Sequence, residues 1–152
     1  MDWQLEMLMV LRTVLAALLG ALIGWERERH GQDAGVRTYA AVALGASSFG
    51  LISMHATGGN QIDTRIAAQV VSGIGFIGAG LIMREQGRAT GLTTAATLWT
   101  TAAVGLAMAF GMYIVSTLTA VITFSILAAH HLPGWKENVA KKHHHNESTE
   151  SV

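Results

Sequence analysis

The sequence predicts an all-α, polytopic membrane protein with about five transmembrane helices. Apolar residues make up 51% of the chain and charged residues only 13%, against a charged share of about 25% in soluble domains. Between Met7 and His130 the charges gather almost entirely in three short clusters, which separate long apolar runs. These runs do not alternate between apolar and polar residues, so they indicate helices that satisfy their own backbone in lipid rather than strands of a barrel.

The apolar runs predict the helices in order: residues 7–25, 38–54, 66–83 and 92–129. Arg12 interrupts the first run and Gln69 the third, and a polar loop is expected at residues 84–91. The last run carries no charge and is too long for one span of about 20 residues, so it predicts two helices. The turn between them is expected near Gly111, between residues 107 and 112.

Cationic residues predict the orientation. Arg65 lies in the second loop, whereas the first loop, the third loop and the tail hold Arg27, Arg29, Arg37, Arg84, Arg88, Lys136, Lys141 and Lys142. The positive-inside rule then places the N-terminus in the periplasm and the C-terminus in the cytoplasm, which requires an odd number of spans. We expect a membrane domain over residues 1–132, a polar, disordered cytoplasmic tail over residues 133–152, and no cleaved signal peptide.

Small residues recur at every fourth position of the predicted spans, for example at Gly20 and Gly24 and at Gly75 and Ala79. Such stripes let helix backbones approach closely in lipid. They either pack the monomer or also form a homodimer face. The threonines between residues 93 and 101 have two interpretations as well: their hydroxyls bond back to the helix backbone, or they line a cavity or a partner helix.

Four blocks of sequence resemble the MgtC/SapB family, and they stand in the family's order over about residues 8–130. The blocks are GALIGWERE (residues 20–28), AGVRT (34–38), AAQVVSGIGFIGAG (67–80) and GLTTAATLW (91–99). The resemblance implies a multi-pass protein of the bacterial inner membrane. It also implies a link to magnesium homeostasis, stress adaptation and virulence, exerted by regulating other membrane proteins rather than by transport. Longer members carry an ACT-like domain after the last span, so this chain resembles a short form without it.

The resemblance also supplies the candidate interaction residues. They are Gly20, Gly24, Glu26, Arg27, Glu28, Gly35, Arg37, Thr38, Gln69, Gly73, Gly75, Phe76, Gly78, Gly80, Thr93, Thr94 and Trp99. The partners implied are the lipid bilayer, other membrane proteins, a second copy of the chain and Mg²⁺, but not nucleic acid. An ion transporter or channel, or a membrane scaffold, remains the alternative function.

The residues that could carry chemistry argue against an enzyme and against a cofactor. Residues 73–78 match G-x-G-x-x-G, but the motif lies inside an apolar span, without the strand and acidic residue of a dinucleotide site. No carboxylate lies in the middle of a span, which argues against a conventional Mg²⁺ path and leaves no metal ligand assigned.

Two charged features have alternative interpretations. At the cytoplasmic edge, Glu26 pairs with Arg37 or Arg84 and holds the spans in register, or the arginines merely anchor the spans to anionic lipid. Arg12 either snorkels outward or faces the bundle with a partner such as Asp63.

Overall fold

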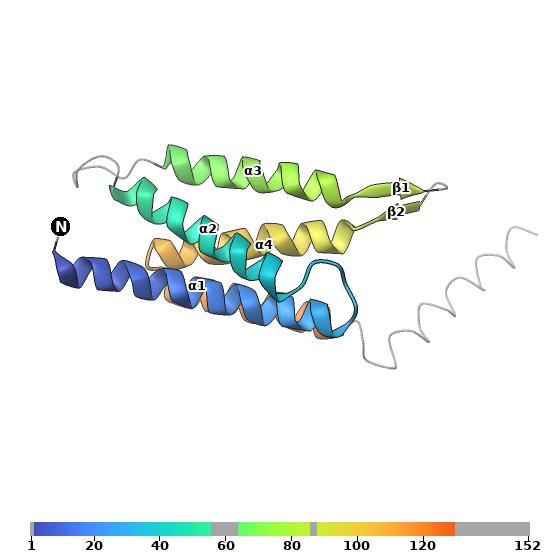
Figure 1. The fold of residues 1–152 in the computed structure, drawn as a ribbon, viewed down its shortest axis with the longest axis horizontal. Helices are drawn as coiled ribbons and strands as arrows, with labels where there is room; N and C mark the ends of the chain where they lie inside the picture. The colour runs from blue at the N-terminus through green and yellow to red at the C-terminus, as the bar shows by residue number, and fades with distance from the viewer. Residues whose placement is uncertain (1, 56–63, 86–87, 130–152) are drawn as a thin grey trace, which may run out of the picture.

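A computed structural model describes residues 2–55, 64–85 and 88–129, in which five helices follow one another along the chain (Figure 1). They are α1 (Trp3–Arg29), α2 (Val36–His55), α3 (Arg65–Leu81), α4 (Leu92–Ala109) and α5 (Tyr113–Ala129). Two short strands, β1 (Met83–Glu85) and β2 (Arg88–Thr90), form an antiparallel hairpin between α3 and α4. The second loop, including Asp63, and the predicted tail at residues 133–152 lie outside the described residues.

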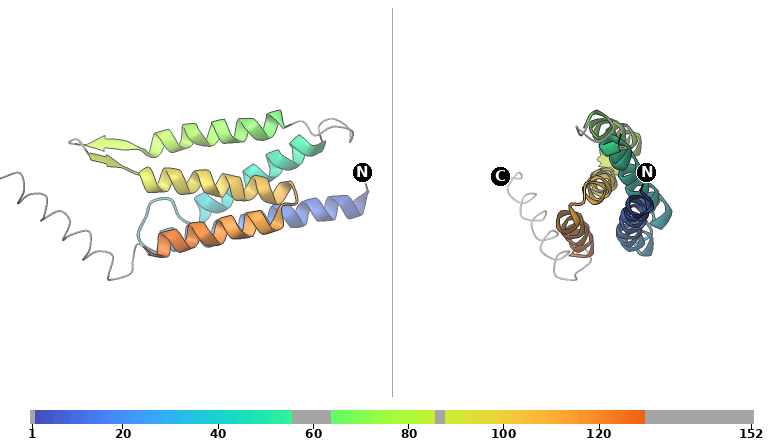
Figure 2. Two further views of the ribbon diagram at one scale, coloured as in Figure 1. Left: turned by 180° about the vertical axis from the view of Figure 1, so that it is seen from behind. Right: turned by 90° about the vertical axis from the view of Figure 1, so that its left-hand side faces the viewer.

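Helix α4 is the centre of the bundle, because it packs against each of the other four helices. Helices α1, α2 and α5 surround it, and α1 packs on both α2 and α5 (Figure 2). Helix α3 lies at the edge, where it packs on α4 and more lightly on α2. The helix that carries the glycine-rich block therefore lies at the edge of the bundle, with Ala67, Ile74 and Gly78 as its buried residues.

Many side chains buried between the helices are small or polar, whereas large apolar side chains cover the outside of the bundle. Buried positions between the helices include Ala16, Ala43, Ala46, Ser47, Gly50, Thr97, Thr101, Gly105 and Ser116. Large apolar side chains cover the exterior, among them Leu18, Leu22, Phe49, Phe76, Ile114, Leu118, Ile122 and Ile126. Monomeric soluble proteins rarely expose contiguous apolar patches above a few hundred Å², and close packing through small residues is typical of helices in lipid.

Two of the helices in the described part of the chain, α1 and α4, are long and apolar enough to cross a membrane by length and composition. Helices α3 and α5 are apolar but shorter. The predicted number of helices is confirmed, whereas the number of membrane crossings and their orientation stay predictions.

The predicted turn near Gly111 is confirmed. Gly111 has a φ of 75°, which glycine adopts without steric cost. The N–H groups of Gly111 and Met112 donate to the carbonyls of Met108 and Ala107 and so satisfy the last turn of α4. The charge-free run therefore folds as two helices that lie side by side.

Arg12 faces the bundle and binds this turn, so the snorkelling interpretation is wrong. Its Nη1 donates to the carbonyl of Ala109 at 2.9 Å, and its Nε donates to the hydroxyl of Tyr113 at 2.8 Å. The guanidinium also lies 5.5 Å from the centre of the Tyr113 ring. A cation at the C-terminal carbonyls of α4 complements the helix dipole, so Arg12 ties α1 to the α4–α5 turn.

The predicted polar loop at residues 84–91 and the third span to Met83 need correction. Helix α3 ends at Leu81, and Met83 pairs with Thr90 across the hairpin. Gly91 has a φ of 81°, and a Cβ at this position would collide with the carbonyl of Leu81. This glycine lets β2 turn directly into α4, which brings the start of α4 back beside the end of α3 (Figure 1).

Candidate functional site

The charged residues of the first loop gather at one end of the bundle, where α1 ends, α2 begins and the hairpin projects (Figure 1). We call this region the charged end; it comprises Glu26, Arg27, Glu28, Arg29, His30, Gln32, Asp33, Arg37 and Thr94. Two of these residues are buried, since Glu26 is 3% exposed and Arg27 is 6% exposed. Burying a charge costs free energy unless it is hydrogen-bonded, so the contacts of these two residues define the site.

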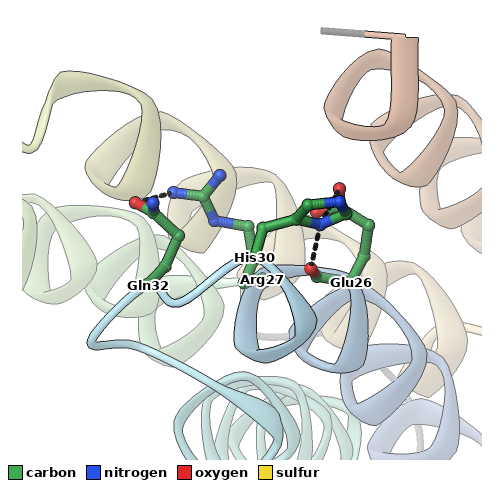
Figure 3. A network of polar contacts seen from close by, with 4 residues as sticks. All are labelled: Glu26, Arg27, His30 and Gln32. Carbon is green, nitrogen blue, oxygen red and sulfur yellow. Dashed lines mark hydrogen bonds and ion pairs between the residues drawn. The ribbon is translucent and has the colours of Figure 1, made fainter. Parts of the chain in front are cut away.

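Arg27 connects three segments of the chain. Its Nη2 donates to the side-chain oxygen of Gln32 at 2.8 Å (Figure 3). The same Nη2 donates to the hydroxyl of Thr94 at 3.0 Å. These bonds join the end of α1 to the α1–α2 loop and to the first turn of α4. Its Nε is buried without a hydrogen-bond partner among the described residues.

Glu26 pairs with His30 one turn further along α1, at 3.0 Å between Oε1 and Nδ1. The same Nδ1 lies 2.8 Å from the Glu26 carbonyl, and this pair points away from the Arg27–Gln32 pair in Figure 3. The predicted pairing of Glu26 with Arg37 or Arg84 is wrong, because neither arginine forms an ion pair with any described residue. The cluster is built mainly within α1 and its following loop, not across three helices.

Glu28 fixes the start of α2. Its Oε2 accepts the backbone N–H of Val36 at 3.0 Å and satisfies one of the free donors of that helix end. A Cβ on Gly35 would lie 2.6 Å from the same oxygen, so the glycine leaves room for the carboxylate in this position. A carboxylate at a helix N-terminus also complements the helix dipole.

A buried hydroxyl pair extends the network into the bundle. The hydroxyl of Tyr39 on α2 lies 2.6 Å from that of Thr97 on α4. The hydroxyl of Thr97 lies within hydrogen-bond distance of the carbonyls of Thr93 and Thr94. The hydroxyl of Thr101 donates to the carbonyl of Thr97. The prediction that these hydroxyls bond back to their own helix is confirmed for Thr97, Thr100 and Thr101, and Thr97 in addition links two helices.

Gly20 and Gly24 pack α1 against α2 and its preceding loop. A Cβ on Gly20 would lie 2.5 Å from the carbonyl oxygen of Tyr39, and one on Gly24 would lie 2.7 Å from that of Gly35. These two candidate residues therefore pack helices within the monomer, which is the first of the two interpretations of the small-residue stripes.

The candidate glycines of α3 have different surroundings. A Cβ on Gly73, Gly75 or Gly80 would meet nothing within 4 Å, and only Gly78 approaches a neighbour, at 3.5 Å from Ala95. Phe76 beside them is 84% exposed. Within the described part of the chain, Gly73, Gly75 and Gly80 therefore have no neighbour that packs closely against them.

A groove of about 700 Å³ runs between α2 and α3. Thr38 and Gln69 supply polar groups to a wall that is otherwise made of apolar side chains and glycines, including Gly73 and Phe76. Trp99 lies elsewhere, half exposed on α4. The structure thus divides the candidate residues between the charged end, the α1–α2 contact, the groove and the surfaces of α3 and α4, and their functional roles stay predictions.

The described part of the chain contains no group of three or more His, Asp or Glu side chains placed to hold a metal ion. His30, Gln32 and Tyr39 belong to the polar network although the sequence pattern did not identify them. The spacing of Glu26 and His30 by four residues could have identified that pair. Nothing in the sequence pattern pointed to the contacts of Tyr39 or Gln32, because their partners come from other elements.

Comparisons with known proteins follow this geometry. The model of a family described as the MgtC family matches residues 13–132. The chain is 52% identical to MgtC of Salmonella typhimurium over 104 residues, which cover 68% of this chain and 44% of that protein. It is 47% identical to MgtC of Brucella abortus over 117 residues, covering 77% and 48% of the two chains.

A third relative is YhiD of Escherichia coli K12, provisionally named a magnesium transporter, at 39% identity over 129 residues. The match covers 80% of this chain and 60% of YhiD. The chain thus spans about half the length of the curated relatives it matches. No solved structure matches it.

Proposed function

The chain belongs to the MgtC family, and we propose that it is a multi-pass protein of the bacterial inner membrane that regulates other membrane proteins in magnesium homeostasis and stress adaptation. It acts through contacts between its helices and those of its partners. The name of one relative, YhiD, refers to magnesium and supports the physiological setting. The large apolar side chains on the exterior of the bundle support a location in the membrane.

The charged end supports the orientation. Arg27, Arg29, Arg37 and Arg84 lie at the ends of helices or in connections that meet there. The positive-inside rule assigns such an end to the cytoplasm. The N-terminus is then periplasmic, and the five helices cross the bilayer in alternating directions.

The observation that carries the proposal is the outer face of α3. Ala68, Ser72, Gly75 and Ala79 follow one another at intervals of four, three and four residues, which places them on one face of the helix. All four are exposed, and none of them lines the groove. Because lipid provides no hydrophobic drive for association, a smooth face of small residues is where another transmembrane helix packs closely.

Cross-linking in the native membrane tests this proposal. A photo-reactive residue at Ser72 is expected to capture a membrane protein in cells, and Gly75→Leu is expected to reduce that capture by about tenfold or more. A leucine at this position would fill the close-contact face without disturbing the monomer, since a Cβ on Gly75 meets nothing within 4 Å. Ala103→Leu, at an exposed position on α4, is the matched control and is expected to leave capture unchanged.

Equal capture by the wild type and Gly75→Leu would refute the use of this face. Capture of only a second copy of the chain would assign the face to a homodimer and reduce the function to a scaffold.

Transport of Mg²⁺ is the second candidate, favoured by the name given to YhiD and by the buried hydroxyls of Thr97, Thr101 and Ser116. These hydroxyls donate to backbone carbonyls in the described helices, which leaves their donors engaged rather than arranged around a water-filled path. Purified protein in liposomes is expected to show no Mg²⁺ flux above empty vesicles. Flux that is lost in Thr97→Val would replace regulation with transport.

A further inference from the structure

The groove between α2 and α3 adjoins a second pocket at the charged end. Thr38 lines both cavities. The second pocket, of about 360 Å³, is lined by Glu28, Gln32, Asp33, Gly35, Arg37 and Thr38. An apolar groove along two helices therefore lies next to a polar pocket, which is the layout that a lipid tail and its headgroup require.

From this adjacency we propose that the groove and the pocket together bind one aminophospholipid from the bilayer leaflet at the charged end. One acyl chain lies between α2 and α3, and the phosphoethanolamine headgroup occupies the pocket. The inference rests on the membrane embedding of the bundle, but not on partner binding by the outer face of α3.

The length of the groove fits one leaflet. Its lining extends along α2 from Thr38 to Phe49 and along α3 from Ile66 to Ile77. Each stretch advances eleven positions, or about 16 Å at about 1.5 Å per residue. Half of a hydrocarbon core of about 30 Å has the same depth, so the groove accommodates one chain from one leaflet.

The surface of the groove fits an acyl chain. Gly45 on α2 and Gly73 on α3 both line the groove, and a Cβ at either position would meet nothing within 4 Å. The two glycines leave a space that side chains of the protein do not fill. Lipid is the solvent around this face in the membrane, and a chain lying in the space restores the dispersion contacts that an empty groove forfeits.

The charges of the pocket select the headgroup. Asp33 and Arg37 both line it, both are exposed, and neither forms an ion pair with any described residue. A guanidinium matches the geometry of a phosphate, and carboxylates accept hydrogen bonds from a primary ammonium. Phosphatidylcholine offers no ammonium N–H donor, and phosphatidylglycerol offers no cation for Asp33 and Glu28. Phosphatidylethanolamine satisfies both signs of charge.

Native mass spectrometry of the delipidated full chain in detergent tests the proposal. Phosphatidylethanolamine, phosphatidylcholine and phosphatidylglycerol with the same acyl chains are added separately at equal concentration. One molecule of phosphatidylethanolamine is expected to bind about fivefold more tightly than either of the others, equivalent to about 1 kcal/mol. Gly73→Leu is expected to lower its retention by about tenfold, because the side chain fills the groove. Arg37→Ala and Asp33→Asn are expected to keep acyl binding but lose the headgroup preference.

Gly75→Leu is the matched control, since this exposed glycine is two residues away on α3 and does not line the groove. It is expected to retain lipid binding while it loses partner capture, and Gly73→Leu is expected to show the reverse, so the two proposals fail separately. Equal retention of the three lipids would overturn the headgroup assignment, as would a preference for phosphatidylglycerol. A lipid-free dimer that Gly73→Leu abolishes would assign the groove to a second copy.

Discussion

The glycines of the α1–α2–α4 core and those of α3 are the same residue in the same kind of apolar run, yet their surroundings are opposite. A Cβ on Gly105 of α4 would collide with the carbonyl of Ala43 and lie 2.9 Å from the Cβ of Ala46. A Cβ on Gly75 of α3 would meet nothing within 4 Å. The core glycines let helix backbones touch within the monomer, whereas the α3 glycines leave a surface for something else.

This difference shows that a small-residue stripe predicts close approach but not the identity of the neighbour. The tight region is also where the polar contacts concentrate, since Arg27, Tyr39 and Thr97 bond across elements there. In the described part of the chain, no side chain between residues 66 and 81 of α3 forms a hydrogen bond to another helix. Four sets of variants test this difference between the core and α3.

The largest effect is expected for Gly105→Ala. The added methyl group would force α2 and α4 apart and cost about 3 kcal/mol, at the upper end of overpacking effects. Unfolding by sodium dodecyl sulfate in mixed micelles, followed by circular dichroism, measures this loss. Gly45→Ala, where a Cβ would meet nothing within 4 Å, is the control and is expected to remain stable. Wild-type stability of Gly105→Ala would remove the contrast altogether.

A smaller loss is expected when the buried arginine of the charged end is replaced. Arg27→Met keeps the length of the side chain but leaves Gln32 and Thr94 without their donor, which costs about 2 kcal/mol. The same unfolding assay measures it. Arg29→Met is the matched control, because Arg29 is exposed and its guanidinium lies 5.5 Å from the centre of the Trp25 ring. Equal losses in the two variants would show that charge near the membrane, rather than the Arg27 network, sets stability.

The contact between Arg12 and the α4–α5 turn is expected to contribute less. Arg12→Leu is expected to cost about 1 kcal/mol, because the hydroxyl of Tyr113 and the carbonyl of Ala109 lose one donor each. Tyr113→Phe and the double variant complete a cycle that isolates the pairwise energy. Strictly additive effects would mean that Arg12 and Tyr113 do not stabilise each other.

The smallest change, and one of opposite sign, is expected for Gly75→Ala. Alanine loses less conformational freedom in a helix than glycine, so the variant is expected to gain about 0.5–1 kcal/mol. A rise in the detergent concentration at mid-unfolding measures the gain. Destabilisation instead would reveal a contact of α3 that the monomer lacks, such as one with a second copy in the micelle.

Much of the fold could be predicted because hydrophobic patterning is a local signal. The long charge-free run and Gly111 predicted two helices and a turn, and the structure has them. The hairpin was missed because Arg84 and its neighbours read as a polar loop, and three-residue strands leave little pattern to detect. The pairing of Met83 with Thr90 depends on how Gly91 turns the chain into α4.

The candidate site was predictable in location but not in its contacts. The sequence placed Glu26, Arg27 and Arg37 together at one end of the bundle, and the structure brings them there. It did not reveal that Arg27 is buried against Thr94, or that Arg37 stays exposed in a pocket beside the groove. Those outcomes depend on how α1 and α2 are rotated about their long axes. A helix with apolar residues on all sides has no sequence pattern that specifies this rotation.

The sequence by itself determined the helices, their limits to within a few residues, and the end at which the charges collect. These properties follow from the cost of placing charge in an apolar run and from the need of a backbone in lipid to bond to itself. Only the tertiary structure decided which glycines touch a neighbour and that a groove separates α2 from α3. The physical reason is that helix rotation and neighbour choice are set by the summed packing of all five helices, and no single stretch of sequence records that sum.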